Sequence, residues 1–290
     1  MERSVRTPDA RTLVVEEGGD PRGRPIVVLA GTPNSRHLFG PTMALAAEQG
    51  IRLIGYDRPG YGGSTAKPGR TIADGASDVR TIADRLGIDR FAVWGISGGG
   101  PHALACAALL EGRAVAVASL ASPAPYGAPG LDFFSGMGEL NVEDIKLYLT
   151  DPDAAWKKTL ADREVMLAGT PEGIREYMSS LLSPVDAAVL TGALAEYMAR
   201  NTKDGLAPGI QGWWDDGVAW MKPWGFELDS IRVPTVLWHG RHDRFVPFSH
   251  GEWLAKAIPN IEAHLSEEDG HLTLTVRRLP AIHAWLLEYF

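Results

Sequence analysis

Short, continuous runs of apolar residues alternate along this chain with longer segments in which apolar residues recur every three or four positions. The short runs predict strands at residues 26–30, 51–56, 91–94, 114–120 and 235–238, and residues 261–265, where polar and apolar positions alternate, predict a further strand. The longer segments predict amphipathic helices, at residues 37–49, 72–86, 102–110, 248–258 and 279–289. Strands that alternate with helices build βαβ units, so the pattern predicts an α/β fold whose mostly parallel central sheet has helices on both faces.

The middle of the chain breaks this rhythm. Between residues 122 and 228 the strand-like runs disappear, and helical stretches separated by proline and glycine take their place, at residues 142–149, 152–168, 171–182 and 185–200. We interpret 122–228 as a helical insertion. The predicted organisation is then a core built from 1–121 and 229–290, with the insertion between the two parts.

A turn rich in glycine joins the predicted strand 91–94 to the helix that follows it. The turn reads Gly95-Ile96-Ser97-Gly98-Gly99, a G-x-S-x-G pattern between strand and helix that is typical of a nucleophile elbow. The turn is so tight that side chains two residues either side of Ser97 would collide with the backbone, and glycine removes them. The simpler interpretation is a glycine-rich turn with an incidental serine, so the rest of the chain has to decide.

Two later loops supply partners for a serine nucleophile, which needs a general base that is itself oriented by an acid. Asp243 follows the predicted strand 235–238, and His271 follows the strand 261–265. The carboxyl ends of parallel strands meet at one edge of a sheet, so both residues are expected beside Ser97. The alternatives are less favourable: His242 adjoins Asp243 and would point away from it, and Asp57 suits hydrogen bonding within its own turn.

Taken together, these motifs resemble those of the α/β-hydrolase fold family, in its serine esterase and proline iminopeptidase-like branch with a helical cap. Residues 57–64 (Asp-Arg-Pro-Gly-Tyr-Gly-Gly-Ser) and 240–247 resemble two loops of that family, and the chain order Ser, Asp, His matches it. The resemblance implies an oxyanion hole formed by the backbone N–H groups of Gly98 and Thr32. The chain has Ala30-Gly31 where the family usually has His-Gly, which puts the packing of the loop around Thr32 in question.

The end of the predicted insertion is rich in tryptophan, with Trp213, Trp214, Trp220 and Trp224 close together. The simpler interpretation is that these rings join the insertion to the core. Alternatively, some of them line a pocket for an apolar group, and the residues proposed for such a substrate pocket are His37, Trp213, Trp214 and Trp220. Asp215 and Asp216 are a second possibility, as an acidic site for a substrate ammonium group.

Composition narrows the function further. A net charge of -8 disfavours binding to nucleic acid. The single cysteine, Cys106, allows no disulfide framework, and His239 with His242 is too small a set for a metal site, so no metal and no cofactor are expected. Residues 1–13 lack the apolar region of a signal peptide and no apolar stretch is long enough to cross a membrane, so a cytoplasmic protein with no membrane partner is expected.

The sequence therefore predicts a serine hydrolase that cleaves a carboxylic ester of a small, mostly apolar substrate through an acyl-enzyme. Ser97, Asp243 and His271 would form the catalytic triad. The alternatives left open are a proline iminopeptidase-like aminopeptidase or amidase, a carbon–carbon bond hydrolase, and a ligand-binding protein without turnover. Nothing in the sequence specifies the substrate or the oligomeric state.

Overall fold

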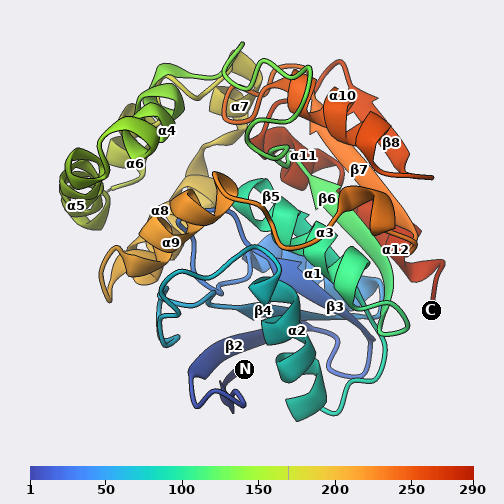
Figure 1. The fold of residues 1–290 in the computed structure, drawn as a ribbon. Helices are drawn as coiled ribbons and strands as arrows, with labels where there is room; N and C mark the ends of the chain where they lie inside the picture. Colours follow the sequence, from blue (N-terminus) through green and yellow to red (C-terminus); the bar gives the residue numbers. More distant parts are fainter. Residues whose placement is uncertain (169) are drawn as a thin grey trace.

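A twisted sheet of eight strands forms the centre of the protein, in a computed structural model that describes residues 1–168 and 170–290 (Figure 1). The strand order is β1-β2-β4-β3-β5-β6-β7-β8. The strands are β1 (Glu2–Arg6), β2 (Thr12–Gly19), β3 (Arg24–Leu29), β4 (Ile51–Tyr56), β5 (Phe91–Ile96), β6 (Ala114–Leu120), β7 (Thr235–Gly240) and β8 (Glu262–Ser266). The pairs β1–β2 and β2–β4 are antiparallel, and all other pairs are parallel. The predicted α/β fold is thus confirmed.

Helices cover both faces of the sheet, which explains why its strands read as continuous apolar runs. In β3, Ile26 and Val28 belong to the core on one face, and Val27 and Leu29 belong to the core on the other. The first face packs against α1 (Gly40–Glu48) and α12 (Leu279–Leu287). The second packs against α2 (Asp74–Arg85), α3 (Gly100–Leu109) and α10 (Phe248–Ala257). The short helix α11 (Leu272–Arg277) follows β8.

Strands β1 and β2 are absent from the elements that the sequence pattern predicts. They form the antiparallel edge of the sheet, and only Val5 of β1 is buried. The edge strand β1, with one buried side chain, gives no apolar run, so the pattern carries no signal for it. This reason does not extend to β2, which pairs on both sides and buries Leu13, Val14 and Val15.

Among the described residues, six α-helices lie between β6 and β7, and Figure 1 shows them in green to orange arching over one end of the sheet. We call them the intervening helices: α4 (Glu139–Thr150), α5 (Pro152–Ala168), α6 (Pro171–Tyr177), α7 (Pro184–Val189), α8 (Gly192–Leu206) and α9 (Gln211–Trp220). The predicted helix 185–200 is in fact two helices, because the chain turns at Gly192, whose φ of 48° is in the left-handed region. The division at residues 122 and 228 stays a prediction.

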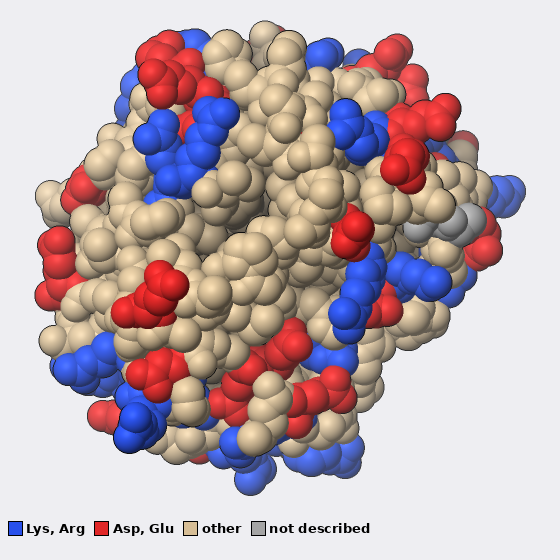
Figure 2. Space-filling view, turned by 180° about the vertical axis from the view of Figure 1, so that it is seen from behind, with Lys and Arg blue, Asp and Glu red and all other residues tan. Residues whose placement is uncertain are grey.

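The surface and the helices add two observations. Within the described residues, no helix combines the length and apolar character that crossing a membrane requires. On the face drawn in Figure 2, acidic and basic side chains are interspersed around the molecule rather than separated by sign, and a broad uncharged area lies between them.

Candidate active site

The turn at Ser97 has the strained geometry of a nucleophile elbow. Ser97 lies between β5 and α3 with a φ of 55°, a conformation that costs energy for a residue with a side chain. A Cβ atom on Gly95 would lie 2.3 Å from the carbonyl oxygen of Gly99, and a Cβ on Gly99 would lie 2.0 Å from that of Leu29. The steric reason for glycine at both positions is therefore confirmed.

Asp243 and His271 meet at the carboxyl edge of the sheet, on the loops that follow β7 and β8. The Nδ1–H group of His271 donates to Asp243 Oδ2 at 2.7 Å. The other oxygen, Oδ1, accepts hydrogen bonds from the backbone N–H groups of Phe245 and Val246, each at 2.8 Å. These bonds fix the carboxylate, and with Nδ1 as the donor the neutral ring keeps a free lone pair on Nε2.

Two carboxylates influence the charge of the His271 ring, which is only 4% exposed. Burial alone would lower the pKa of His271, but the charge and hydrogen bond of Asp243, together with the charge of Asp186, raise it above its ordinary value. Asp186 belongs to α7 and accepts a hydrogen bond from the backbone N–H of His271 at 3.0 Å. The environment therefore favours the protonated form of the His271 ring.

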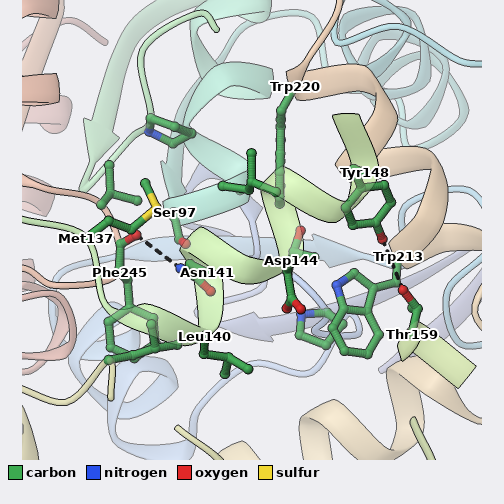
Figure 3. Close-up of a pocket in the computed structure, with 18 of the residues that line it drawn as sticks. Ser97, Met137, Leu140, Asn141, Asp144, Tyr148, Thr159, Trp213, Trp220 and Phe245 are labelled. Atoms are coloured by element: carbon green, nitrogen blue, oxygen red, sulfur yellow. Dashed lines mark hydrogen bonds between the residues drawn. The ribbon is translucent and has the colours of Figure 1, made fainter. Parts of the chain in front are cut away.

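A cavity of about 160 Å³ opens beside Ser97, with Gly98 and Thr32 in its wall. Phe245 also lines it, and its ring stacks on that of His271 with centroids 4.4 Å apart. Figure 3 shows Ser97 toward one end and Trp213 toward the other. The remaining lining is mostly apolar and comes largely from the segment between β6 and β7; it includes Met137, Leu140, Ile145, Met166, Met178, Leu181, Trp220 and Met221.

In the part of the chain that the structure describes, the hydroxyl of Ser97 and the ring of His271 are not hydrogen-bonded to each other. Ser97 lines the cavity, and His271 stacks on Phe245, which lines the same cavity. Catalytic hydrogen bonds are often long in unliganded sites and shorten when substrate binds.

The cavity also contains a carboxylate that no sequence motif indicates. Asp144 of α4 lies in the middle of the cavity (Figure 3), and its Oδ1 is 2.6 Å from Lys158 Nζ. Burial raises the pKa of Asp144, and the hydrogen bond and charge of Lys158 oppose the rise. No motif marks this residue, because only the packing of α4 against its neighbours brings it to the cavity.

Two of the four expected pocket residues lie elsewhere, which corrects that expectation. Trp213 and Trp220 line the cavity beside Ser97, but Trp214 packs edge-on against Trp156, with ring centroids 5.0 Å apart. His37 lines a separate cavity, and its ring contacts Asp204 at 3.0 Å. Adjacent residues of a helix point about 100° apart, so Trp213 and Trp214 of α9 cannot both face one cavity.

Gly98 and Thr32, the expected oxyanion-hole residues, are in close contact. A Cβ atom on Gly98 would lie 2.5 Å from the hydroxyl oxygen of Thr32 and 2.5 Å from the ring of Trp220. Gly98 is therefore glycine because the loop at Thr32 and a ring of α9 approach it from both sides. The side chain of Arg58 donates to the carbonyl oxygen of Ala30, where the resembled family has histidine.

The residues considered as alternatives have other roles in the structure. Asp57 accepts hydrogen bonds from the backbone N–H groups of Arg36 at 2.6 Å and Gly63 at 2.9 Å, so it stabilises its own turn. His242 is exposed, whereas Asp243 beside it is buried.

The acidic pair considered for a substrate ammonium is not at the cavity. Asp215 accepts from the backbone N–H of Gly69 at 3.2 Å, and Asp216 is fully buried in an ion pair with Arg58 at 2.7 Å. Neither residue is among those that line the cavity beside Ser97.

Comparisons with known proteins identify the family. The chain matches the family described as alpha/beta hydrolase fold over residues 24–276, which is most of its length. The protein therefore belongs to the alpha/beta hydrolase fold family, as its motifs and its fold indicate.

The relatives of this chain carry different names. The chain is 28% identical over 278 residues to the AB hydrolase superfamily protein YisY of Bacillus subtilis, covering 93% of this chain and 92% of that protein. It is 26% identical over 229 residues to a 2-hydroxy-6-oxononadienedioate/2-hydroxy-6-oxononatrienedioate hydrolase of Klebsiella pneumoniae, covering 77% of this chain and 71% of the relative. Among solved structures, an esterase from Exiguobacterium antarcticum has the same fold, with a TM-score of 0.69, 22% identity and 99% of each chain covered.

Proposed function

We propose that this protein is a serine hydrolase that cleaves carboxylic esters of small, uncharged and mostly apolar substrates. Ser97 Oγ attacks the ester carbonyl while its proton passes to Nε2 of His271. The tetrahedral intermediate then expels the alcohol, which takes that proton from His271. Water attacks the acyl-enzyme by the same route, and His271 returns a proton to Ser97 as the acid leaves.

One observation carries this proposal: strained Ser97 opens on a cavity whose wall includes Phe245, the residue that stacks on the Asp243-bound His271. The raised pKa of His271 supports its role as general base, because Asp243 and Asp186 stabilise the imidazolium that forms when it accepts a proton. The backbone N–H groups of Gly98 and Thr32 would hold the oxyanion in the transition state.

The charge of the cavity favours esters over the substrates of similar carbon–carbon bond hydrolases. The Klebsiella relative is named for dioate substrates, which carry two negative charges at neutral pH. Among the described residues that line this cavity there is no lysine, arginine or histidine, and Asp144 is an acid. A buried anion needs a cationic partner, so a dianionic substrate would be strongly disfavoured here.

The positions of the two acidic residues favour an esterase over an aminopeptidase. That alternative depended on Asp215 and Asp216 as an ammonium site, and both are engaged away from the cavity. Activity toward prolyl amides is therefore expected to be much lower than activity toward esters.

Hydrolysis of p-nitrophenyl esters from acetate to decanoate tests the proposal, with proline p-nitroanilide as the competing substrate. We expect the Ser97→Ala and His271→Ala variants to lose on the order of 10⁴-fold in kcat. His242→Ala is the matched control, because this exposed histidine adjoins the acid loop and is expected to keep the wild-type rate. Ester turnover that persists in Ser97→Ala, or faster cleavage of the prolyl amide, would refute the proposal.

A further inference from the structure

Asp216 of α9 is fully buried, and several polar side chains contact its carboxylate. The proposed reaction does not explain why they meet there. Its Oδ2 accepts hydrogen bonds from the Thr32 hydroxyl at 2.7 Å, the Tyr61 hydroxyl at 2.8 Å and Arg58 Nη2 at 2.7 Å. Its Oδ1 is 2.6 Å from Arg70 Nη2. Burial alone would raise the pKa of Asp216, but the two guanidinium groups hold it well below its ordinary value, so the carboxylate stays ionised.

Thr32 belongs to the loop that carries the proposed oxyanion donor, which we call the oxyanion loop. Arg58 holds this loop through hydrogen bonds. Arg58 donates to the carbonyl oxygen of Ala30, to that of Gly31 at 3.4 Å and to the hydroxyl of Thr32 at 2.9 Å. The backbone N–H of Asn34 also donates to the Gly31 carbonyl, at 3.1 Å. The ion pair with Asp216 therefore fixes the guanidinium that holds these carbonyl groups.

The orientation of one peptide plane connects this cluster to catalysis. The carbonyl of Gly31 and the N–H of Thr32 belong to the same trans peptide, so they point in opposite directions. Because Arg58 and Asn34 hold the carbonyl on one side, the Thr32 N–H faces the other. A Cβ atom on Gly31 would lie 3.4 Å from Cβ of Ser97, so this peptide is next to the proposed nucleophile.

We propose that Asp216 is a positioning residue for the oxyanion hole. It acts through Arg58 and the Thr32 hydroxyl to keep the Thr32 N–H directed at the reacting carbonyl, and this role rests on the proposed function. The helix that carries Asp216 also carries Trp213 and Trp220, which line the cavity. Thus α9 shapes the substrate site and orients the donor that stabilises the transition state.

A purely structural cluster would behave differently under substitution, and the chain offers a matched pair of variants to show it. Thr32→Val and Tyr61→Phe each remove one hydroxyl that donates to the same oxygen of Asp216. Only the first hydroxyl belongs to the oxyanion loop. The Thr32 hydroxyl donates its proton to Asp216, so that proton is not available to the oxyanion directly.

We expect Thr32→Val to lower kcat about 10- to 100-fold for p-nitrophenyl butyrate, less than the loss of a whole oxyanion donor, with KM within about threefold. A trifluoromethyl ketone, which forms a tetrahedral adduct, should bind more weakly by a similar factor. Thr32→Ser should recover most of the lost kcat. Tyr61→Phe should lower thermal stability as Thr32→Val does but change kcat less than threefold.

Asp216→Asn tests the acid itself, and its effect on kcat should not add to that of Thr32→Val if both act through one loop. If the Asp216→Asn variant does not fold, the comparison of Thr32→Val with Tyr61→Phe still tests the positioning role. Equal losses of kcat in Thr32→Val and Tyr61→Phe, or a change in KM alone, would overturn the positioning role.

Hydrogen exchange of residues 30–34 separates this inference from the proposed function, because it does not require turnover. We expect faster exchange in Thr32→Val than in Tyr61→Phe. A wild-type protein without Ser97-dependent ester hydrolysis would refute the function, whereas equal exchange in the two variants would refute the positioning of the loop.

Discussion

The carboxylate of Asp186, in helix α7, holds the loop that carries His271. Replacing Asp186 with asparagine removes this negative charge. Oδ2 of Asp186 accepts hydrogen bonds from the His271 N–H at 3.0 Å and the Ser183 hydroxyl at 2.8 Å. Oδ1 accepts from the N–H groups of Leu272 at 2.8 Å and Thr273 at 3.2 Å. A carboxylate thus occupies the N-terminal end of α11, where a negative charge is favourable.

The size of the effect follows from the geometry. Whichever oxygen becomes the amide NH₂ group, two donors on that side lose their acceptor and face another donor. Hydrogen bonds to charged groups contribute about 1.5–3 kcal/mol each, and the Ser183 hydroxyl can rotate away, so we expect a loss of about 2–4 kcal/mol in the free energy of unfolding. The site cannot relax easily, because a Cβ on Gly270 would already lie 2.2 Å from Asp186 Oδ2.

The same substitution changes the pH dependence of catalysis. The charge of Asp186 helps to raise the pKa of His271, so its removal lowers that pKa. Since the general base must be neutral, the acid limb of kcat/KM should move to lower pH. A raised pKa in the folded state contributes stability that is complete below the unfolded histidine pKa of about 6.5 and is lost as pH rises through the folded value. The Asp186→Asn cost should therefore be larger at pH 5 than at pH 9.

Urea unfolding and a pH–rate profile measure both effects. We expect a lower unfolding midpoint with an unchanged m value, together with the shifted acid limb. Asp153→Asn is the matched control, since this exposed acid of α5 should change stability by no more than about 0.5 kcal/mol and leave the profile in place. An Asp186→Asn protein with wild-type stability and a wild-type acid limb would show that the reasoning is mistaken.

Three further substitutions test the site. Gly99→Ala should destabilise the protein by more than about 1 kcal/mol and abolish most activity, because its Cβ meets a backbone carbonyl at 2.0 Å, whereas Gly40→Ala, with no atom within 4 Å, should be neutral by thermal unfolding. Asp243→Asn should lower kcat on the order of 10⁴-fold without loss of fold, as measured by ester hydrolysis and circular dichroism, and a small loss would exclude it as the orienting acid. Trp220→Leu should move the preferred acyl chain toward longer esters by enlarging the cavity; an unchanged preference would place the acyl group elsewhere.

The features that could be predicted from sequence are those that local chemistry determines. Continuous apolar runs predict strands buried on both faces, and β3 to β7 follow that rule. The elbow was recognisable because a steric clash dictates glycine at fixed spacing around Ser97. The hydrogen bond between His271 and Asp243 was predictable because parallel strands bring the loops at their carboxyl ends together.

The features that could not be predicted depend on contacts between residues far apart in the chain. The turn at Gly192 splits a segment that reads as one helix, since helical periodicity continues on both sides of it. Which tryptophan of α9 faces the cavity depends on how that helix is rotated against α4 and α5, and no local pattern reports a rotation. Asp216 stands beside Asp215 in the sequence, but no local pattern indicates that its partner Thr32 lies 184 positions away.

Asp186 and Asp216 together connect the intervening helices to the proposed active site. One carboxylate holds the backbone of the His271 loop, and the other holds the Thr32 loop through Arg58. Both are buried, and α9, the helix that carries Asp216, also lines the cavity beside Ser97. Exchange of these helices for those of a relative would therefore remove two supports of the core site along with the substrate cavity. A transplant designed to change specificity should retain carboxylates at both positions, and one that lacks them should bind the new substrate without turning it over efficiently.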